Sequence, residues 1–260
     1  VGVIAKLIQY YTYANIALFS VGGFFILYTL YRSFQYEKAQ RNRLLACIFL
    51  VGLSIIFSIL YQQASMSFNL FTDFNTNRNA GGWHIPTLMF QAVNPFFIIL
   101  LGPVMAKSWV WLGRIKCNPS VPVKFGLGTC FMGIGFAIMP FIIHHFSLHG
   151  KVSYVWIIVS YFFQTLGEMF VSPIGLSMVA DLSPVKMMGL MMGVWYFATA
   201  AANDLAGFVS VWTTATSDTN DPLLTSTLYA HVFGELGIVS IIAGFVIFLT
   251  APKLKKLIAS

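Results

Sequence analysis

Charged residues are scarce in this sequence: only 9% of its 260 residues are Asp, Glu, Lys or Arg, whereas 58% are hydrophobic. Soluble globular domains have about 25% charged and about 45–50% apolar residues, so a soluble domain is excluded. Intrinsic disorder is excluded as well, because it requires low hydrophobicity and high net charge. The composition instead predicts a protein that lies in a lipid bilayer.

Cysteine and catalytic motifs are also sparse. The three cysteines are odd in number and widely spaced, which predicts free thiols rather than disulfides or a CxxC metal pair. HExxH, GxSxG and phosphate-binding glycine-rich motifs are missing, so we expect neither an enzyme nor a cofactor. His145 and His149 have the spacing of a zinc pair but no acidic or thiol ligand nearby, and we interpret them as histidines at the membrane surface. The net charge of +7 does not indicate nucleic-acid binding, because the basic residues alternate with apolar runs.

Long apolar runs are what the sequence does contain. A helix needs roughly 20 apolar residues to cross a hydrocarbon core about 30 Å thick. Continuous runs without strand-like alternation favour helices over a barrel. Seven runs are long enough, which predicts an all-α membrane protein. They are Tyr13–Tyr31, Leu44–Leu70, Pro86–Leu112, Phe125–Phe146, Val152–Val179, Met187–Trp212 and Leu228–Ala251.

The basic residues predict the orientation of these helices. Twelve of the fifteen Lys and Arg lie at the first, third and fifth connections or after the last span, and only Lys6, Arg78 and Lys151 lie on the other side. Cytoplasmic loops of membrane proteins carry an excess of Lys and Arg. We therefore expect the C-terminus and the basic connections to be cytoplasmic, in an inner (plasma) membrane.

Three acidic residues lie inside predicted spans, although a charge at the membrane centre costs about 2.5–3.5 kcal/mol. Glu168 is near the middle of the fifth span, and Gln164 and Ser172 lie one turn away on the same helix face. We interpret Glu168 as a transport residue; the alternative is a protonated side chain hydrogen-bonded to a neighbouring helix. Asp204 and Glu235 lie closer to span ends, where hydration is easier, and we favour a structural or gating role for both.

Further amides and hydroxyls occur in the second, third and sixth spans and, together with Glu168, predict a polar central cavity. Each alone is more typical of helix–helix hydrogen bonding. The fourth and seventh spans lack a mid-span amide or carboxylate, so we expect them on the lipid-facing outside. The polar residues are Tyr61, Gln62, Gln63, Ser65, Asn69, Gln91, Asn94, Trp195, Thr199 and Asn203.

Five segments resemble proton-dependent oligopeptide transporters, the peptide-permease branch of the major facilitator superfamily. They are YEKAQRNR, LYQQASMSFNLF, FQAVNPFF, YFFQTLGEMFVSPIGLSMV and GVWYFATAAA, and the likeness is greatest to the enterobacterial di- and tripeptide permeases. The resemblance covers nearly the whole chain and corresponds to the C-terminal half of such a transporter. It implies a six-helix C-terminal bundle over residues 44–260, preceded by an extra hairpin helix and a basic cytoplasmic loop over residues 1–43.

The resemblance also implies roles for individual residues. Glu168 resembles the glutamate that holds the amino terminus of the peptide and joins proton coupling. Asn94 resembles an asparagine that contacts the peptide backbone, and Trp195 resembles a tryptophan of the pocket wall. Three further residues fall at pocket-lining positions: Ser172, Thr199 and Tyr61.

One departure concerns the outer gate of the family. Many members carry an acid there that pairs with an arginine of the first half, whereas this chain has Gln62 and Gln63, as the enterobacterial branch does. The ExxERFxYY motif of the family's first half does not occur in these 260 residues.

These observations together predict the C-terminal half of a di-/tripeptide symporter driven by the proton gradient. The expected partners are a peptide, protons, the N-terminal six-helix half and the lipid bilayer. The alternatives are a non-transporting membrane half that acts as a partner-binding scaffold and a permease half for another small polar solute. An intramembrane enzyme pairing Glu168 with His144 or His145 is disfavoured, because roughly 20 Å of helix separates them at about 1.5 Å per residue.

Overall fold

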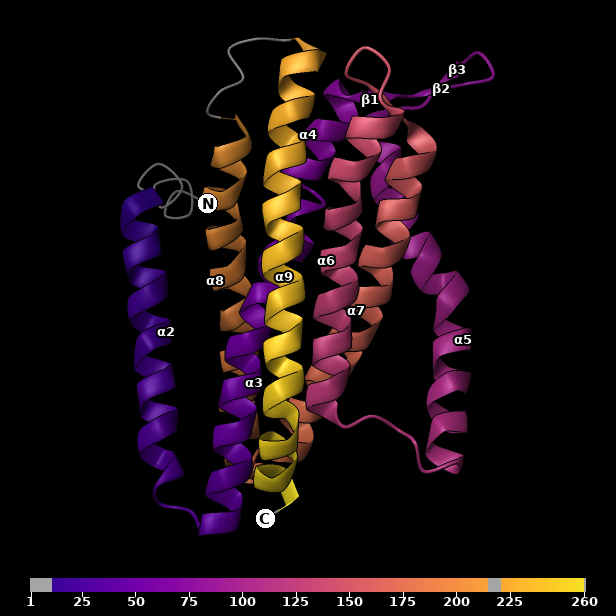
Figure 1. Ribbon diagram of the computed structural model, residues 1–260. Coiled ribbons are helices and arrows are strands. Elements are labelled where there is room, and N and C mark those ends of the chain that lie inside the picture. Colours follow the sequence, from indigo (N-terminus) through magenta and orange to yellow (C-terminus); the bar gives the residue numbers. More distant parts are fainter. Residues whose placement is uncertain (1–10, 215–220, 260) are drawn as a thin grey trace.

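The computed structural model describes residues 11–214 and 221–259, and in them seven helices are long and apolar enough to cross a membrane, as predicted (Figure 1). The long helices are α2 (Tyr11–Ser33), α3 (Lys38–Gln63), α5 (Val93–Arg114), α6 (Val121–Phe146), α7 (Tyr154–Leu182), α8 (Met188–Thr214) and α9 (Pro222–Ala259). The short helices are α4 (Ser67–Phe74), η1 (Thr87–Ala92) and η2 (Val185–Met187). Four two-residue strands also form, which hydropathy did not predict: β1 (Thr76–Asn77), β2 (Asn79–Ala80), β3 (Trp83–His84) and β4 (Val152–Ser153).

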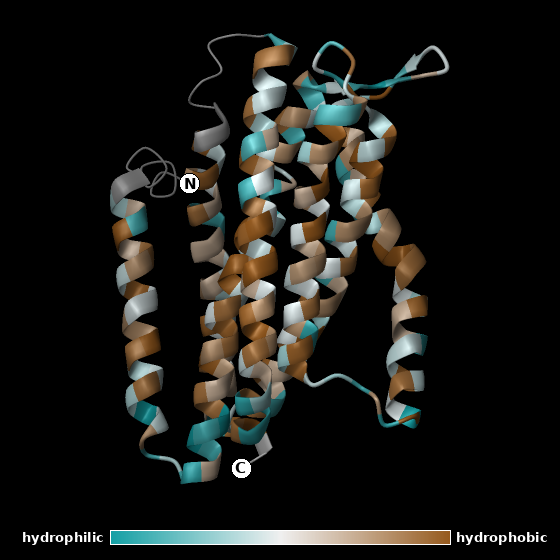
Figure 2. Ribbon diagram, in the orientation of Figure 1, coloured by the Kyte–Doolittle hydropathy of each residue, from teal (hydrophilic) through white to brown (hydrophobic). Residues whose placement is uncertain are grey.

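The connections between the long helices alternate between two ends of the bundle (Figure 1). The basic end carries residues 34–37, residues 115–120 and the C-terminal end of α9, and the strand end carries β1 to β4. Hydrophilic residues gather towards both ends, and the middle of the helices is mostly hydrophobic (Figure 2). This alternation agrees with the pattern of Lys and Arg, although Lys6 lies outside the described residues. The side of the membrane that each end faces stays a prediction.

The second predicted span is not one continuous helix. α3 begins at Lys38, six residues before the predicted Leu44, and ends at Gln63, and α4 starts after a short turn. Gln63 stabilises this break, because its fully buried side chain donates to the Ala206 carbonyl (2.9 Å) and accepts from the Ser67 hydroxyl (2.6 Å). The predicted span Leu44–Leu70 thus lies within one membrane-length segment, Lys38–Phe74, that a turn after Gln63 divides into two helices, and hydropathy does not register this turn.

Helix α6 lies inside the bundle, packed against α7 and α9. Of its 18 most apolar consecutive residues 56% are buried, the largest share among the seven spans. Glycines permit this packing. A Cβ on Gly128 would lie 2.8 Å from the Gly167 carbonyl oxygen in α7, and a Cβ on Gly133 would lie 2.9 Å from the Gly237 carbonyl oxygen in α9. The prediction of an outside position is thus wrong for α6, because small residues decide which helices approach closely in a membrane.

Asn75 joins three connections at the strand end. Its buried side-chain Nδ2 lies 3.0 Å from the Gly150 carbonyl oxygen, 2.8 Å from the Pro222 carbonyl oxygen and 3.1 Å from the Thr225 hydroxyl. Its own carbonyl accepts a hydrogen bond from the Val152 N–H (2.9 Å), where β1 pairs with β4 in parallel. One amide therefore connects the end of α4, the α6–α7 connection and the start of α9.

Replacing Asn75 by Asp is expected to lower the thermal unfolding midpoint of the detergent-solubilised chain. Aspartate has nearly the same shape, but it has no N–H donors and turns a carboxylate towards two carbonyl oxygens. A buried group left unsatisfied costs about 1–3 kcal/mol, and a charged group costs more. Asn77→Asp is the matched control: Asn77 is exposed, and its Oδ1 only accepts from the Asn79 N–H, which aspartate can also do. Equal midpoints for the two variants would contradict the role given to Asn75.

Candidate functional site

The carboxylate of Glu168 lies where three helices meet. Glu168 is half-buried in α7, and its Oε2 accepts a hydrogen bond from Asn94 Nδ2 of α5 at 2.8 Å. The side chain of Tyr61, near the end of α3, lies beside the same carboxylate. Three residues predicted separately for the site are therefore brought together around one acid.

The start of α5 explains how Asn94 reaches this position. The segment before it forms η1 rather than a regular helix, and α5 begins at Val93. Pro95 stands in the first turn, where its missing N–H leaves no helical bond unmade. The chain thus enters α5 at the depth of Glu168, and the first polar side chain of the helix bonds to the carboxylate.

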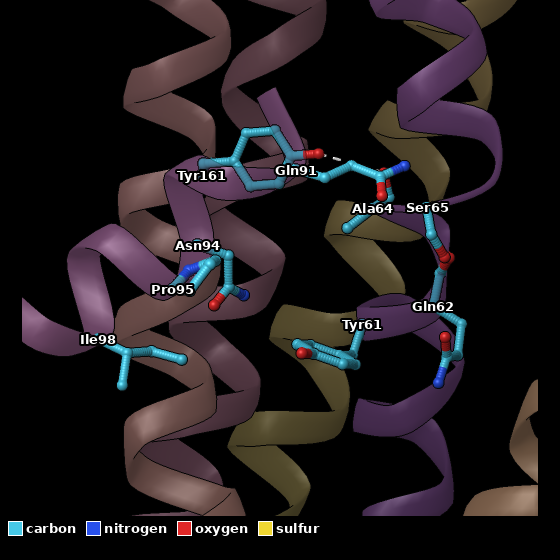
Figure 3. Close-up of a pocket in the computed structure, with 9 residues that line it drawn as sticks. All are labelled: Tyr61, Gln62, Ala64, Ser65, Gln91, Asn94, Pro95, Ile98 and Tyr161. Atoms are coloured by element: carbon cyan, nitrogen blue, oxygen red, sulfur yellow. Dashed lines mark hydrogen bonds between the residues drawn. The ribbon is translucent and has the colours of Figure 1, made fainter. Parts of the chain in front are cut away.

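A pocket of about 360 Å³ adjoins this cluster (Figure 3). A volume of this size is typical of small-molecule sites, which lie at about 300–1,000 Å³. Amides and hydroxyls from α3, α5 and α7 line much of the wall, and the Tyr161 hydroxyl donates to the Ala64 carbonyl at 3.2 Å. The lining residues are Tyr61, Gln62, Ala64, Ser65, Gln91, Asn94, Pro95, Ile98 and Tyr161.

Five of the predicted site residues are not among those that line this pocket. One is Glu168, which adjoins the pocket through its hydrogen bond with the lining residue Asn94. The other four lie elsewhere. Trp195 is 9% exposed, and its ring packs against Gly175 of α7. The ring occupies the position that a side-chain Cβ at residue 175 would take. Thr199 donates its hydroxyl to the Trp195 carbonyl within α8 (3.2 Å), and Ser172 lies half-buried one turn beyond Glu168. Gln63 makes the helix break described above. Their roles in binding or gating stay predictions.

The predicted polar face of α7 divides between two neighbours. Gln164 is buried against α6, where a Cβ on Gly135 would lie 2.9 Å from its Cγ, and its Nε2 donates to the Ser160 hydroxyl at 3.0 Å. Glu168, one turn later, faces α5 and α3 instead. Helical spacing predicts both residues on one face of α7. That face is wide enough to contact α6 at Gln164 and α3 and α5 at Glu168.

Three polar side chains of the pocket, those of Ser65, Gln91 and Tyr161, were not among the predicted site residues. The sequence predicts Ser65 and Gln91 only as polar residues of the second and third spans. Tyr161 was missed, although it stands seven residues before Glu168, two turns away on the same helix face. That spacing is the signal that could have found it.

The other intramembrane acids lie away from this cluster. Glu235 is exposed and 3.6 Å from His231, one turn earlier on α9. Asp204 is half-buried on α8. Among the residues that the structure describes, no three His, Cys, Asp or Glu side chains lie close enough together to hold a metal ion.

Comparison with known proteins assigns the chain to a family. The family model described as the POT family matches residues 7–226. The chain belongs to the POT family. Dipeptide and tripeptide permease B of Aliivibrio fischeri is 34% identical over 99% of this chain and 52% of that permease. Dipeptide and tripeptide permease A of Salmonella typhimurium is 34% identical over 86% of this chain and 44% of that permease.

Solved POT structures share the fold. A crystal structure of a variant of the peptide transporter POT in complex with alafosfalin has a TM-score of 0.80 and 31% identity, covering 98% of this chain and 50% of that chain. Tetrameric PepTSo2 also has a TM-score of 0.80, with 29% identity over 97% of this chain and 51% of its own. The chain thus has the fold of about half of a major facilitator transporter, as predicted, and spans about half the length of the curated relatives it matches.

Proposed function

We propose that this chain is the C-terminal half of a proton-coupled di-/tripeptide symporter and that it forms the side of the cavity that binds the amino terminus of the peptide. The observation that carries the proposal is the Glu168 carboxylate, which accepts a hydrogen bond from Asn94 and has Tyr61 beside it, next to a pocket between α3, α5 and α7. The POT relatives named above support peptide as the substrate class.

The chemistry of the cluster suits this task. An ionised Glu168 attracts the ammonium group of a peptide, and at about 4 Å that attraction is worth about 4 kcal/mol near a protein surface. The Asn94 amide and the pocket amides supply donors and acceptors for the peptide backbone. Protonation of Glu168 removes the charge and weakens the hold on the ammonium group, so entry of a proton is tied to release of the peptide.

The complete transporter needs a second wall. α5 has no buried residue in this structure, which leaves a long apolar helix for lipid or for another set of helices. Alternating access in major facilitator transporters rocks one half against the other. We infer that an N-terminal six-helix half provides the opposite wall, in an inner membrane with the basic end towards the cytoplasm.

Co-expression with the N-terminal half of a POT transporter tests the proposal. The two halves are expected to co-purify and, in liposomes, to accumulate a labelled dipeptide when an inward proton gradient is imposed; either half alone should not. Unlabelled tripeptide should compete, and single amino acids or sugars should not. Association without uptake would favour a scaffold, and competition by another solute would favour a different permease.

A further inference from the structure

A cationic and aromatic stripe covers one face of α5 near the basic end. Lys107, Trp111 and Arg114 follow one another at spacings of four and three residues, so they share a helix face. With Ala106 and Val110 they line a shallow pocket of about 370 Å³, separate from the pocket beside Glu168. Trp111 is 60% exposed and Val110 is 57% exposed, so this face has no partner within the described chain.

The positive charge at this end of α5 has no acidic residue near it in the sequence. The sequence has no Asp or Glu between Asp73 and Glu168, a stretch that contains Lys107 and Arg114. The ion pairs Arg78–Asp73 and His231–Glu235 both lie outside α5. Nearby, Lys124 of α6 lies 4.1 Å from the ring centre of Trp109, which adds a further cation at the same end.

The position of the stripe decides what kind of anion suits it. Arg114 is the last residue of α5, at the end of the bundle where the C-terminus also lies (Figure 1). Lys107 lies two turns deeper, and its long apolar stem lets the ammonium reach the headgroup level. Tryptophan favours the same interface, where its ring is in contact with acyl chains and its N–H is in contact with polar groups. Val110 and Ala106 complete an apolar floor that fits an acyl chain better than it fits a free ion.

We propose that this α5 stripe binds the phosphate of an anionic phospholipid headgroup in the leaflet at the basic end. Lys107 and Arg114 contact the phosphate, Trp111 packs between them at the interface, and the acyl chains lie along the exposed apolar side of α5. Basic pockets on membrane helices bind anionic headgroups in this way. The proposal does not depend on peptide transport.

Native mass spectrometry of the purified chain in mixed micelles of phosphatidylcholine and phosphatidylglycerol tests the proposal. The chain is expected to retain phosphatidylglycerol in preference. Each surface cation contributes about 1 kcal/mol to anionic-lipid binding, so the double variant Lys107→Gln/Arg114→Gln should reduce the preference on the order of thirtyfold. Lys107→Arg should keep it, because the charge is retained.

The matched control removes two charges from the same end of the bundle. Lys255 and Lys256 of α9 are exposed, and Lys255→Gln/Lys256→Gln should leave the preference unchanged. Equal loss in the two double variants, or loss in neither, would overturn the proposal. Displacement of the bound lipid by excess inorganic phosphate would also overturn it, because the site would then be one for free anions.

Discussion

Substitution of Glu168 by Gln in the complete, two-half transporter is expected to abolish proton-driven accumulation of a labelled dipeptide. Glutamine keeps the volume and the hydrogen bond with Asn94 but can neither carry the charge that attracts an ammonium group nor exchange a proton. Hydrogen bonds to charged groups contribute about 1.5–3 kcal/mol, so affinity for the peptide should fall on the order of ten- to hundredfold. Uptake in liposomes with an imposed pH gradient and equilibrium binding of the dipeptide measure the two losses separately.

Glu235→Gln is the matched control for this substitution. It makes the same chemical change in another span, but Glu235 is exposed and lies 3.6 Å from His231 on its own helix rather than beside a pocket residue. Uptake by this variant should stay close to that of the unmodified transporter. Normal uptake by Glu168→Gln would refute the coupling role of Glu168, and similar losses in both variants would show that any intramembrane acid is needed.

Gly167→Ala is expected to lower the stability of the chain markedly. Gly167 lies where α7 approaches α6, and the new Cβ would lie 2.6 Å from the Gly128 carbonyl oxygen and 2.9 Å from the Met132 nitrogen. Both are backbone atoms, so the two helices must move apart. Overpacking of this kind costs about 1–3 kcal/mol. Because Glu168 is the next residue, the shift should also weaken dipeptide binding.

Gly102→Ala separates packing from helix propensity. Both substitutions replace a helical glycine by the best helix former, a gain of about 1 kcal/mol in each case. Gly102 is on α5, and a Cβ built there meets no atom of the described chain within 4 Å. Thermal unfolding in detergent should therefore show a lower midpoint for Gly167→Ala and an unchanged or higher one for Gly102→Ala. Equal shifts would contradict the close approach of α6 and α7.

Much of the fold followed from composition. A lipid environment requires every backbone group to be bonded within its own segment, so long apolar runs form helices wherever they occur. The same rule made Glu168 conspicuous, because a carboxylate among apolar residues is costly unless it has partners. Asn94 and Tyr61 were included through the family resemblance, and the structure places both beside Glu168.

Other features depended on contacts between distant segments. The break after α3 rests on Gln63 and Ala206, which are 143 residues apart in the chain. The burial of α6 rests on glycines of three helices that meet without side chains between them. Neither feature leaves a local pattern, since a glycine or a glutamine in a lipid-facing position would give the same hydropathy.

The sequence by itself determined that the chain has seven membrane-spanning segments and that the connections between them alternate between basic and non-basic. It also determined that Glu168 is the acidic residue nearest the middle of a span. These properties are sums over neighbouring residues, and the bilayer acts on such sums directly. Only the tertiary structure decided which side chains meet Glu168, that Trp195 packs on Gly175 rather than lining the pocket, and that α6 is interior. Helix packing depends on which small residues face one another, and residues far apart in the chain choose those faces together.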